Sequence, residues 1–182
     1  MKTALLVIDV QMALAHDDAA GAERSCPEAE GNITQLLSTF RDRGHTVVHI
    51  HHHGVDADDP FHPDAPGSAV QPYARPEDGE KVYVKNGSSS FIGTTLEADL
   101  KAAGITRVFT CGATANHCVE TATRMASNLG FDTYYAADAV WAYSATGPDG
   151  VTHSAQTIHS TTLANLQGEF AHVMPTSDLL KI

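Results

Sequence analysis

The fold is decided by one stretch, TRVFTCGATANHCVETATRMASNLGFDTYYAADA, at residues 106–139. An apolar run of strand length (106–112) is followed by a segment with helical spacing (116–129) and by a second β-rich run (131–139). This alternation predicts a βαβ unit, in which a helix joins two parallel strands. The unit places Cys118 where the first strand passes into the helix. A free cysteine at that position is either a small buried side chain or a nucleophile.

The rest of the chain repeats the same alternation. Further strands are predicted at residues 4–10, 45–51, 81–85 and 170–174, and further helices at 26–44, 94–104 and 152–167. Six strands joined by helices predict an α/β fold, a three-layer α/β/α sandwich around a mainly parallel, Rossmann-like sheet. No repeat or break in composition divides the chain, so a single domain over residues 1–182 is expected.

One long segment does not fit the alternation. Residues 52–80 are rich in Pro, Gly, Asp and His and show no helical or strand period. Loops of this length in a compact domain are usually either functional or disordered. We interpret the segment as a lid or rim over a pocket, with disorder as the alternative.

Charge and composition exclude several classes of partner. The chain has 11 Lys and Arg against 22 Asp and Glu, a formal charge of -11, which would repel nucleic acid and anionic membranes. No apolar run approaches the roughly 20 residues that span a bilayer. Three cysteines without metal-type spacing, and a first strand that follows Met1 without a cleavage site, predict a cytoplasmic protein.

Three polar residues come at one edge of the predicted sheet. Asp9 lies near the end of the first strand, Lys85 ends the third, and Cys118 follows the fourth. Ligands of doubly wound sheets bind beyond the carboxyl ends of the strands. A helix N-terminus lowers the pKa of a nearby thiol, a carboxylate accepts its proton, and an ammonium holds the carboxylate ionised. Together these residues indicate a nucleophilic site.

Each residue alone has a simpler interpretation. Asp9 at a strand end is compatible with a loop cap or with a magnesium ligand, although the chain has no glycine-rich GxxxxGK[ST] loop for a nucleotide. Lys85 is compatible with a solvated edge residue, and Cys118 with a buried apolar filler. Only their convergence at one cavity favours catalysis.

Three separated blocks resemble the isochorismatase-like cysteine hydrolase superfamily. They are ALLVIDVQ, the long block from VKNGSSSFIGT to CVETATRMASNLGFDTY, and LANLQGEF. The resemblance covers nearly the whole chain and implies the three-layer fold with a six-stranded parallel sheet. It also implies a catalytic triad of Asp9, Lys85 and Cys118.

The resemblance implies further features of the site. A cis peptide is expected between Ala113 and Thr114, with the amides of Thr114 and Cys118 forming an oxyanion hole. Relatives that cleave isochorismate typically lack the cysteine, so Cys118 indicates hydrolysis of a small amide, ureide or carbamoyl compound. Substrate contacts are expected from the residues that match pocket positions of relatives: Leu14, His53, Phe61, Phe91 and His117.

Metal binding and assembly are also suggested by relatives. Nicotinamidase-like members hold a metal through an Asp-x-His pair and further histidines, and His51, His53 and His62 offer a partial match without the Asp. We therefore expect no metal and no cofactor, with these histidines as a polar pocket wall. Relatives are commonly homo-oligomers, so a dimer or tetramer is expected. Trp141 lies beyond the fifth strand, at the edge suited to a pocket or a subunit contact.

Three functional hypotheses remain from the sequence. The first is a cysteine hydrolase that cleaves a C–N bond of a small amide, ureide or carbamoyl compound through a thioester. The second is a small-molecule binding or scaffold protein that retains the fold without turnover. The third is oxidative chemistry at Cys118, which lacks an evident resolving cysteine.

Overall fold

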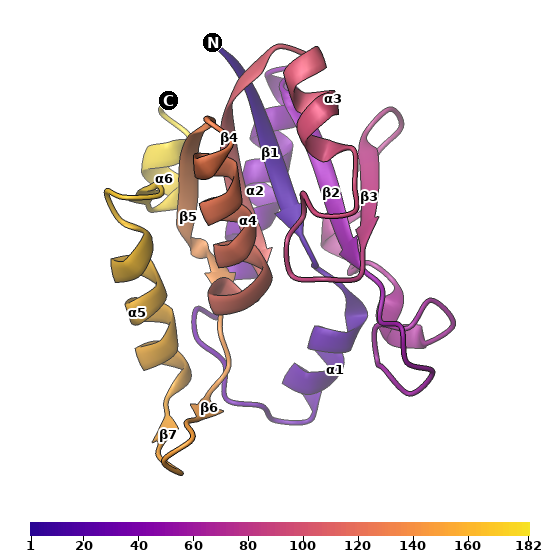
Figure 1. Cartoon of the computed structure of the whole chain (residues 1–182), viewed down its shortest axis with the longest axis vertical. Helices are drawn as coiled ribbons and strands as arrows, with labels where there is room; N and C mark the ends of the chain where they lie inside the picture. The colour runs from indigo at the N-terminus through magenta and orange to yellow at the C-terminus, as the bar shows by residue number, and fades with distance from the viewer.

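A six-stranded parallel sheet forms the centre of the computed structural model, which describes residues 1–182 (Figure 1). The strand order is β3-β2-β1-β4-β5-β8, and every neighbouring pair is parallel. The strands are β1 (Lys2–Ile8), β2 (Thr46–His52), β3 (Lys81–Lys85), β4 (Ile105–Ala113), β5 (Asp132–Trp141) and β8 (His172–Met174). This architecture confirms the predicted α/β fold.

Helices cover both faces of the sheet. One face carries α3 (Leu96–Ala102), α4 (Glu120–Asn128) and α5 (Ala155–Leu166), and the other carries α2 (Ala29–Asp42) and α6 (Thr176–Leu179). The helix α1 (Met12–Ala19) lies below the lower end of β1 (Figure 1). None of the helices is both long and apolar enough to cross a bilayer.

Several short elements were not predicted. They are α1, α6, the protruding hairpin of β6 (Ala145–Thr146) and β7 (Thr152–His153), and the 3₁₀ turns η1 (Pro66–Ser68) and η2 (Pro72–Ala74). All except α1 have two to four residues. Such short elements do not complete a recognisable hydrophobic period.

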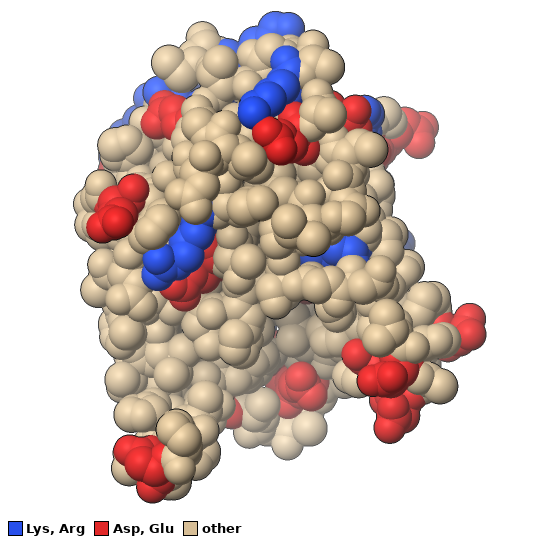
Figure 2. All heavy atoms as spheres, viewed as in Figure 1, with Lys and Arg blue, Asp and Glu red and all other residues tan.

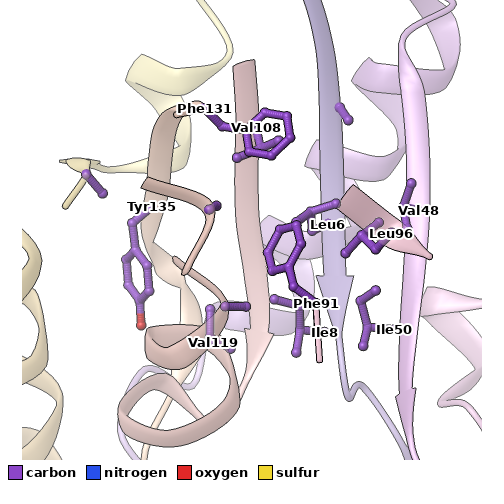
Figure 3. Close-up of a cluster of buried hydrophobic side chains, with 14 of the residues drawn as sticks. Leu6, Ile8, Val48, Ile50, Phe91, Leu96, Val108, Val119, Phe131 and Tyr135 are labelled. Atoms are coloured by element: carbon purple, nitrogen blue, oxygen red, sulfur yellow. The ribbon is translucent and has the colours of Figure 1, made fainter. Parts of the chain in front are cut away.

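The sheet separates two apolar cores. In β1, Leu6 and Ile8 point into the core beneath α3 and α4, whereas Leu5 and Val7 point into the core beneath α2. Figure 3 shows the first core, in which Phe91 lies beside Leu6 and Ile8, and Val119 comes from the turn before α4. A central strand buried on both faces explains the continuous apolar run ALLVI.

The predicted loop after β2 packs against the segment that follows β1. The amide of Gln71 donates to the carbonyl of Val10 at 2.9 Å, and the amide of Met12 donates to the carbonyl of Ala69 at 2.7 Å. The loop therefore borders the carboxyl edge of the sheet. The order of the strands reverses between β1 and β4 at this edge, which is where doubly wound folds bind ligands.

Candidate active site

Asp9 follows β1 directly and turns the chain away from the sheet. Its φ angle is 51°, in the left-handed region that Asp tolerates better than most residues. Its amide donates to the carbonyl of Ile50 at 2.9 Å, which fixes the turn against β2. The side chain is almost fully buried. β1 therefore ends at Ile8, two residues earlier than predicted, and the carboxylate faces inward.

Lys85 is the last residue of β3, and its ammonium contacts both of the other residues of the predicted triad. The Nζ atom donates to Oδ2 of Asp9 at 2.7 Å and to Sγ of Cys118 at 3.4 Å. It also contacts Nδ1 of His52 at 3.3 Å. The lysine side chain has no exposed surface. A carboxylate, an ammonium and a thiol from distant parts of the sequence thus meet at one point.

Cys118 lies in a π-helical turn, η3 (Ala115–Val119), which links β4 to α4. The predicted continuous helix over 116–129 is therefore interrupted at its start, and π turns of this kind occur frequently at functional sites. Burial, followed by the charge of Asp9, raises the pKa of the Cys118 thiol to about 12, while Lys85 opposes the rise. The lowering of the thiol pKa that was expected from the helix N-terminus is therefore outweighed by burial, and the thiol depends on a neighbouring base to give up its proton.

Asp9 is the group placed to accept that proton. Burial raises the pKa of its carboxyl, and the charge of Lys85 and contact with the Cys118 thiol oppose this rise without cancelling it. Oδ2 is held by Lys85, whereas Oδ1 is buried without a hydrogen-bond partner. A buried carboxylate oxygen without a hydrogen-bond donor costs free energy, and such an atom in a native structure often marks a catalytic role.

The turn after β4 brings backbone close to the same place. Gly112 has a φ angle of 116°, and a Cβ atom there would lie 2.0 Å from the carbonyl oxygen of Ile8. Only glycine allows β4 to approach β1 so closely. The peptide bond between Ala113 and Thr114, one residue further on, is cis.

These elements enclose a cavity of about 350 Å³. Its walls are Asp9, Leu14, His52, Phe61, Ser88, Ala113, Thr114, His117 and Cys118. Leu14, Phe61 and His117 thus lie where substrate contacts were expected. Figure 2 shows the surface hollowed below α4, between the lobe that carries α5 and the lobe formed by the 52–80 loop.

Two of the expected substrate contacts lie elsewhere. His53 is half-buried but does not line the cavity, and its neighbour His52 takes that place. Side chains alternate along β2, so an error of one residue selects the opposite face of the sheet. Phe91 packs in the apolar core beside Leu6 and Ile8 (Figure 3), and its ring stacks on Phe131. Apolar packing therefore accounts for Phe91.

The histidines considered as metal ligands are dispersed. The ring of His51 lies 6.5 Å from that of His49, whereas Lys85 and the cavity are contacted by His52. His62 lies 3.8 Å from the exposed carboxylate of Asp64. No three or more His, Cys, Asp or Glu side chains are grouped as metal ligands. The HxH spacing of His51 and His53 does not form a cluster with His62.

Trp141 ends β5 inside the second core and is fully buried. Its Nε1 donates to the hydroxyl of Tyr143 at 3.2 Å, and the guanidinium of Arg24 lies 4.2 Å from its ring centroid. The expectation that Trp141 lines a pocket or a subunit contact is wrong, because β5 extends two residues further than predicted.

Three polar residues at the site were missed by the sequence interpretation. His52 and Ser88 line the cavity. Gln11 is fully buried, and its amide group accepts from the backbone N–H of His52 at 2.7 Å and donates to the carbonyl of the same residue at 2.9 Å. A glutamine two residues after a strand-end aspartate was the one available signal for this clamp.

Comparison with known proteins identifies the family. The isochorismatase domain family matches residues 3–178. The chain belongs to the isochorismatase family. It is 42% identical over 179 residues to the uncharacterised isochorismatase family protein YrdC of Bacillus subtilis, covering 98% of this chain and 95% of that protein.

A solved structure of an isochorismatase-family protein from Chromobacterium violaceum is similar to this chain, with a TM-score of 0.94 and 38% sequence identity. The match covers 99% of this chain and 92% of the Chromobacterium chain. A streptothricin hydrolase of Streptomyces noursei is 37% identical over 134 residues, which are 70% of this chain and 45% of that protein. The protein is therefore an isochorismatase-family hydrolase.

Proposed function

We propose that this protein hydrolyses a C–N bond of a small amide, ureide or carbamoyl compound with Cys118 as the nucleophile. The observation that carries the proposal is the position of Lys85, whose ammonium contacts Oδ2 of Asp9 at 2.7 Å and Sγ of Cys118 at 3.4 Å at the edge of a cavity. A nucleophile, a base and a group that orients both form the arrangement that covalent catalysis requires.

The first half of the reaction forms a thioester. The thiol proton moves to Asp9 as sulfur attacks the carbonyl carbon, and the electron pair of the C=O bond moves to oxygen. Because Oδ1 of Asp9 makes no hydrogen bond at rest, it is the oxygen available for the proton. The tetrahedral intermediate then collapses, the C–N bond breaks, and Asp9 returns the proton to the leaving nitrogen.

The second half releases the acid. Water gives a proton to Asp9 as its oxygen attacks the thioester carbon, and the C–S bond breaks as the sulfur regains that proton. Asp9 is a base and then an acid in each half. The buried ammonium of Lys85 favours the ionised form of Asp9 between steps, since it opposes the effect of burial on the carboxyl pKa.

Oxyanion stabilisation is proposed for the turn after β4. Thr114 and Cys118 both border the cavity, and their amides are the donors proposed for the negative oxygen. One such donor typically contributes roughly 3 kcal/mol to transition-state stabilisation.

The cavity walls favour a small, uncharged substrate. Leu14, Phe61 and Ala113 are apolar. The one carboxylate in the wall, that of Asp9, is paired with the buried ammonium of Lys85. No arginine and no further carboxylate lines the cavity. The relative named streptothricin hydrolase supports hydrolysis as the reaction class.

Ammonia release from a panel of amides, ureides and carbamates tests the proposal. The panel includes nicotinamide, biuret and carbamoylsarcosine, and each compound is assayed with the wild-type protein and with Cys118→Ala. We expect release with at least one compound and none with Cys118→Ala. The buried Cys111→Ala variant controls for loss of a thiol. Turnover that survives Cys118→Ala, or tight binding of panel compounds without any turnover, would favour a binding protein instead.

A further inference from the structure

One histidine contacts the proposed catalytic lysine and has no role in the reaction described above. Nδ1 of His52 lies 3.3 Å from Nζ of Lys85. An ammonium only donates hydrogen bonds, so Nδ1 must be the acceptor and the ring must be neutral with its proton on Nε2. The pKa of His52 is lowered, first by burial and then by the charge of Lys85, which agrees with a neutral ring.

We propose that His52 is a positioning residue for Lys85, a role that rests on the proposed function. The lysine ammonium has three N–H donors and three neighbours: Oδ2 of Asp9, Sγ of Cys118 and Nδ1 of His52. All three donors are thereby used. With its third donor satisfied, the ammonium stays directed at both the base and the sulfur, and it has no donor left for a substrate or for water.

The ring of His52 is itself held from several sides. Gln11 binds both the N–H and the carbonyl of its backbone, at 2.7 and 2.9 Å. The ring of Phe61 packs edge-on at 5.5 Å between centroids. The acceptor atom is therefore fixed before any substrate enters.

The charged and titratable groups around this ring are few. Lys85 lowers the pKa of His52, whereas Asp9 and Asp59, the latter in the loop after β2, raise it. Removal of the Nδ1 acceptor frees one donor of Lys85, and the hold of the ammonium on Asp9 weakens. Because Lys85 lowers the pKa of Asp9, a weaker hold raises the apparent pKa of the Asp9 and Cys118 pair.

The test is the pH dependence of Cys118 alkylation by iodoacetamide, measured by peptide mass spectrometry. The range of about pH 4 to 9 extends from the ordinary pKa of a carboxyl group to that of a thiol. Four proteins are compared: wild type, His52→Leu without an acceptor, His52→Asn with an amide oxygen near the place of Nδ1, and His153→Leu. His153 is an exposed histidine in β7 and serves as the matched control. Thermal unfolding verifies that each variant is folded.

We expect the acid limb of the His52→Leu profile to move to higher pH. A rise of one pKa unit slows alkylation by about tenfold on that limb. His52→Asn and His153→Leu keep the wild-type limb. If His52→Leu does not fold, His52→Gln replaces it, because the longer side chain carries its amide toward the place of Nε2.

The outcomes separate the two proposals. If wild-type Cys118 reacts no faster than Cys26 and Cys111, the proposed function fails. If wild-type Cys118 reacts fast but His52→Leu keeps its profile, or if His52→Asn shifts as far as His52→Leu, the role of His52 as an acceptor is overturned and the proposed function stands.

Discussion

At the scale of single residues, the site depends on two neighbouring acidic groups, Asp9 and Cys118, and on the positive charge of Lys85 beside them. Burial raises the pKa of Asp9 and of Cys118, and the charge of Lys85 opposes both shifts. The pair titrates as a coupled unit. In the proposed reaction the carboxylate of Asp9 therefore takes the thiol proton as the substrate is attacked, rather than before it binds.

Replacement of Lys85 by Met should remove activity and make stability depend more strongly on pH. Asp9 loses its only charged donor, so its folded-state pKa rises further above the ordinary value of 3.8. A raised carboxyl pKa means that stability falls as pH increases above 3.8 toward the folded pKa. Breaking a buried pair costs about 3–5 kcal/mol at neutral pH, and urea unfolding at pH 4 and pH 7 measures the difference.

The control for that variant is Lys81→Met on the same strand. Lys81 is largely exposed and lies 3.2 Å from Asp99, and exposed pairs contribute about 0–1 kcal/mol. Equal losses in the two variants, or a Lys85→Met protein that is as stable at pH 7 as at pH 4, would contradict the charge compensation described here.

The residues of the site were predictable to different degrees. Asp9, Lys85 and Cys118 follow from strand ends in a parallel sheet, and the structure brings them within contact. His52 was missed in favour of His53 because HIHHH contains histidine on both faces of β2, so no alternation identifies the inward side chain. The pKa of Cys118 depends on burial and on a neighbouring carboxylate, which no local pattern contains.

At the scale of elements, the close approach of β4 to β1 shapes the cavity. Strand limits were predicted to within about two residues for most strands, and β3 has the predicted limits. The end of β1 was placed too late because Val10, directly after Asp9, is again apolar. The turn itself depends on the left-handed backbone of Asp9. The π turn before α4 has no signal in the residue pattern either.

Gly112→Ala should destabilise the protein strongly. A methyl group at that position would lie 2.0 Å from the carbonyl oxygen of Ile8 in the paired strand, and the φ angle of 116° is unfavourable as well. We expect a loss of about 4 kcal/mol or more. Gly130→Ala is the control, since its φ angle of 88° is also positive but no atom lies within 4 Å, and it should cost about 1 kcal/mol. Similar melting temperatures for both variants would contradict this view of the turn.

Glu80 joins α2 to β2 and to the end of the long loop. Its carboxylate contacts Arg41 at 2.8 Å and His49 at 2.8 Å. Although burial raises the pKa of Glu80, Arg41 and the other donors outweigh that effect and lower it from 4.5 to about 2. The stabilisation is therefore present above pH 4.5 and is lost as the pH falls toward 2.

Glu80→Gln should accordingly be less stable than wild type at pH 7, and the difference should shrink as the pH falls from 4.5 to 2. Denaturant unfolding at several pH values measures it. Glu97→Gln, in an exposed pair with Lys101, is the control and should change stability little. A pH-independent difference for Glu80→Gln would show that its charge is not involved.

At the scale of the whole molecule, the two cores share β1 and should be lost together. Trp141 lies in the core beneath α2, whereas α4 and α5 pack on the other core. We expect tryptophan fluorescence and far-ultraviolet circular dichroism to report one thermal transition at the same temperature, as for a single two-state domain. Two separated transitions would instead divide residues 1–182 into independent units.

The central claim is that Asp9 activates Cys118 inside an accessible cavity, and the rate of iodoacetamide labelling at each cysteine tests it most directly. Cys26 and Cys111 are buried outside the cavity, whereas Cys118 lines it. We predict that Cys118 in the folded protein reacts at least about 100-fold faster than either other thiol, and that Asp9→Asn slows it by about 100-fold, the typical contribution of a general base. Equally slow labelling of all three thiols, or a Cys118 rate unchanged by Asp9→Asn, would contradict the claim.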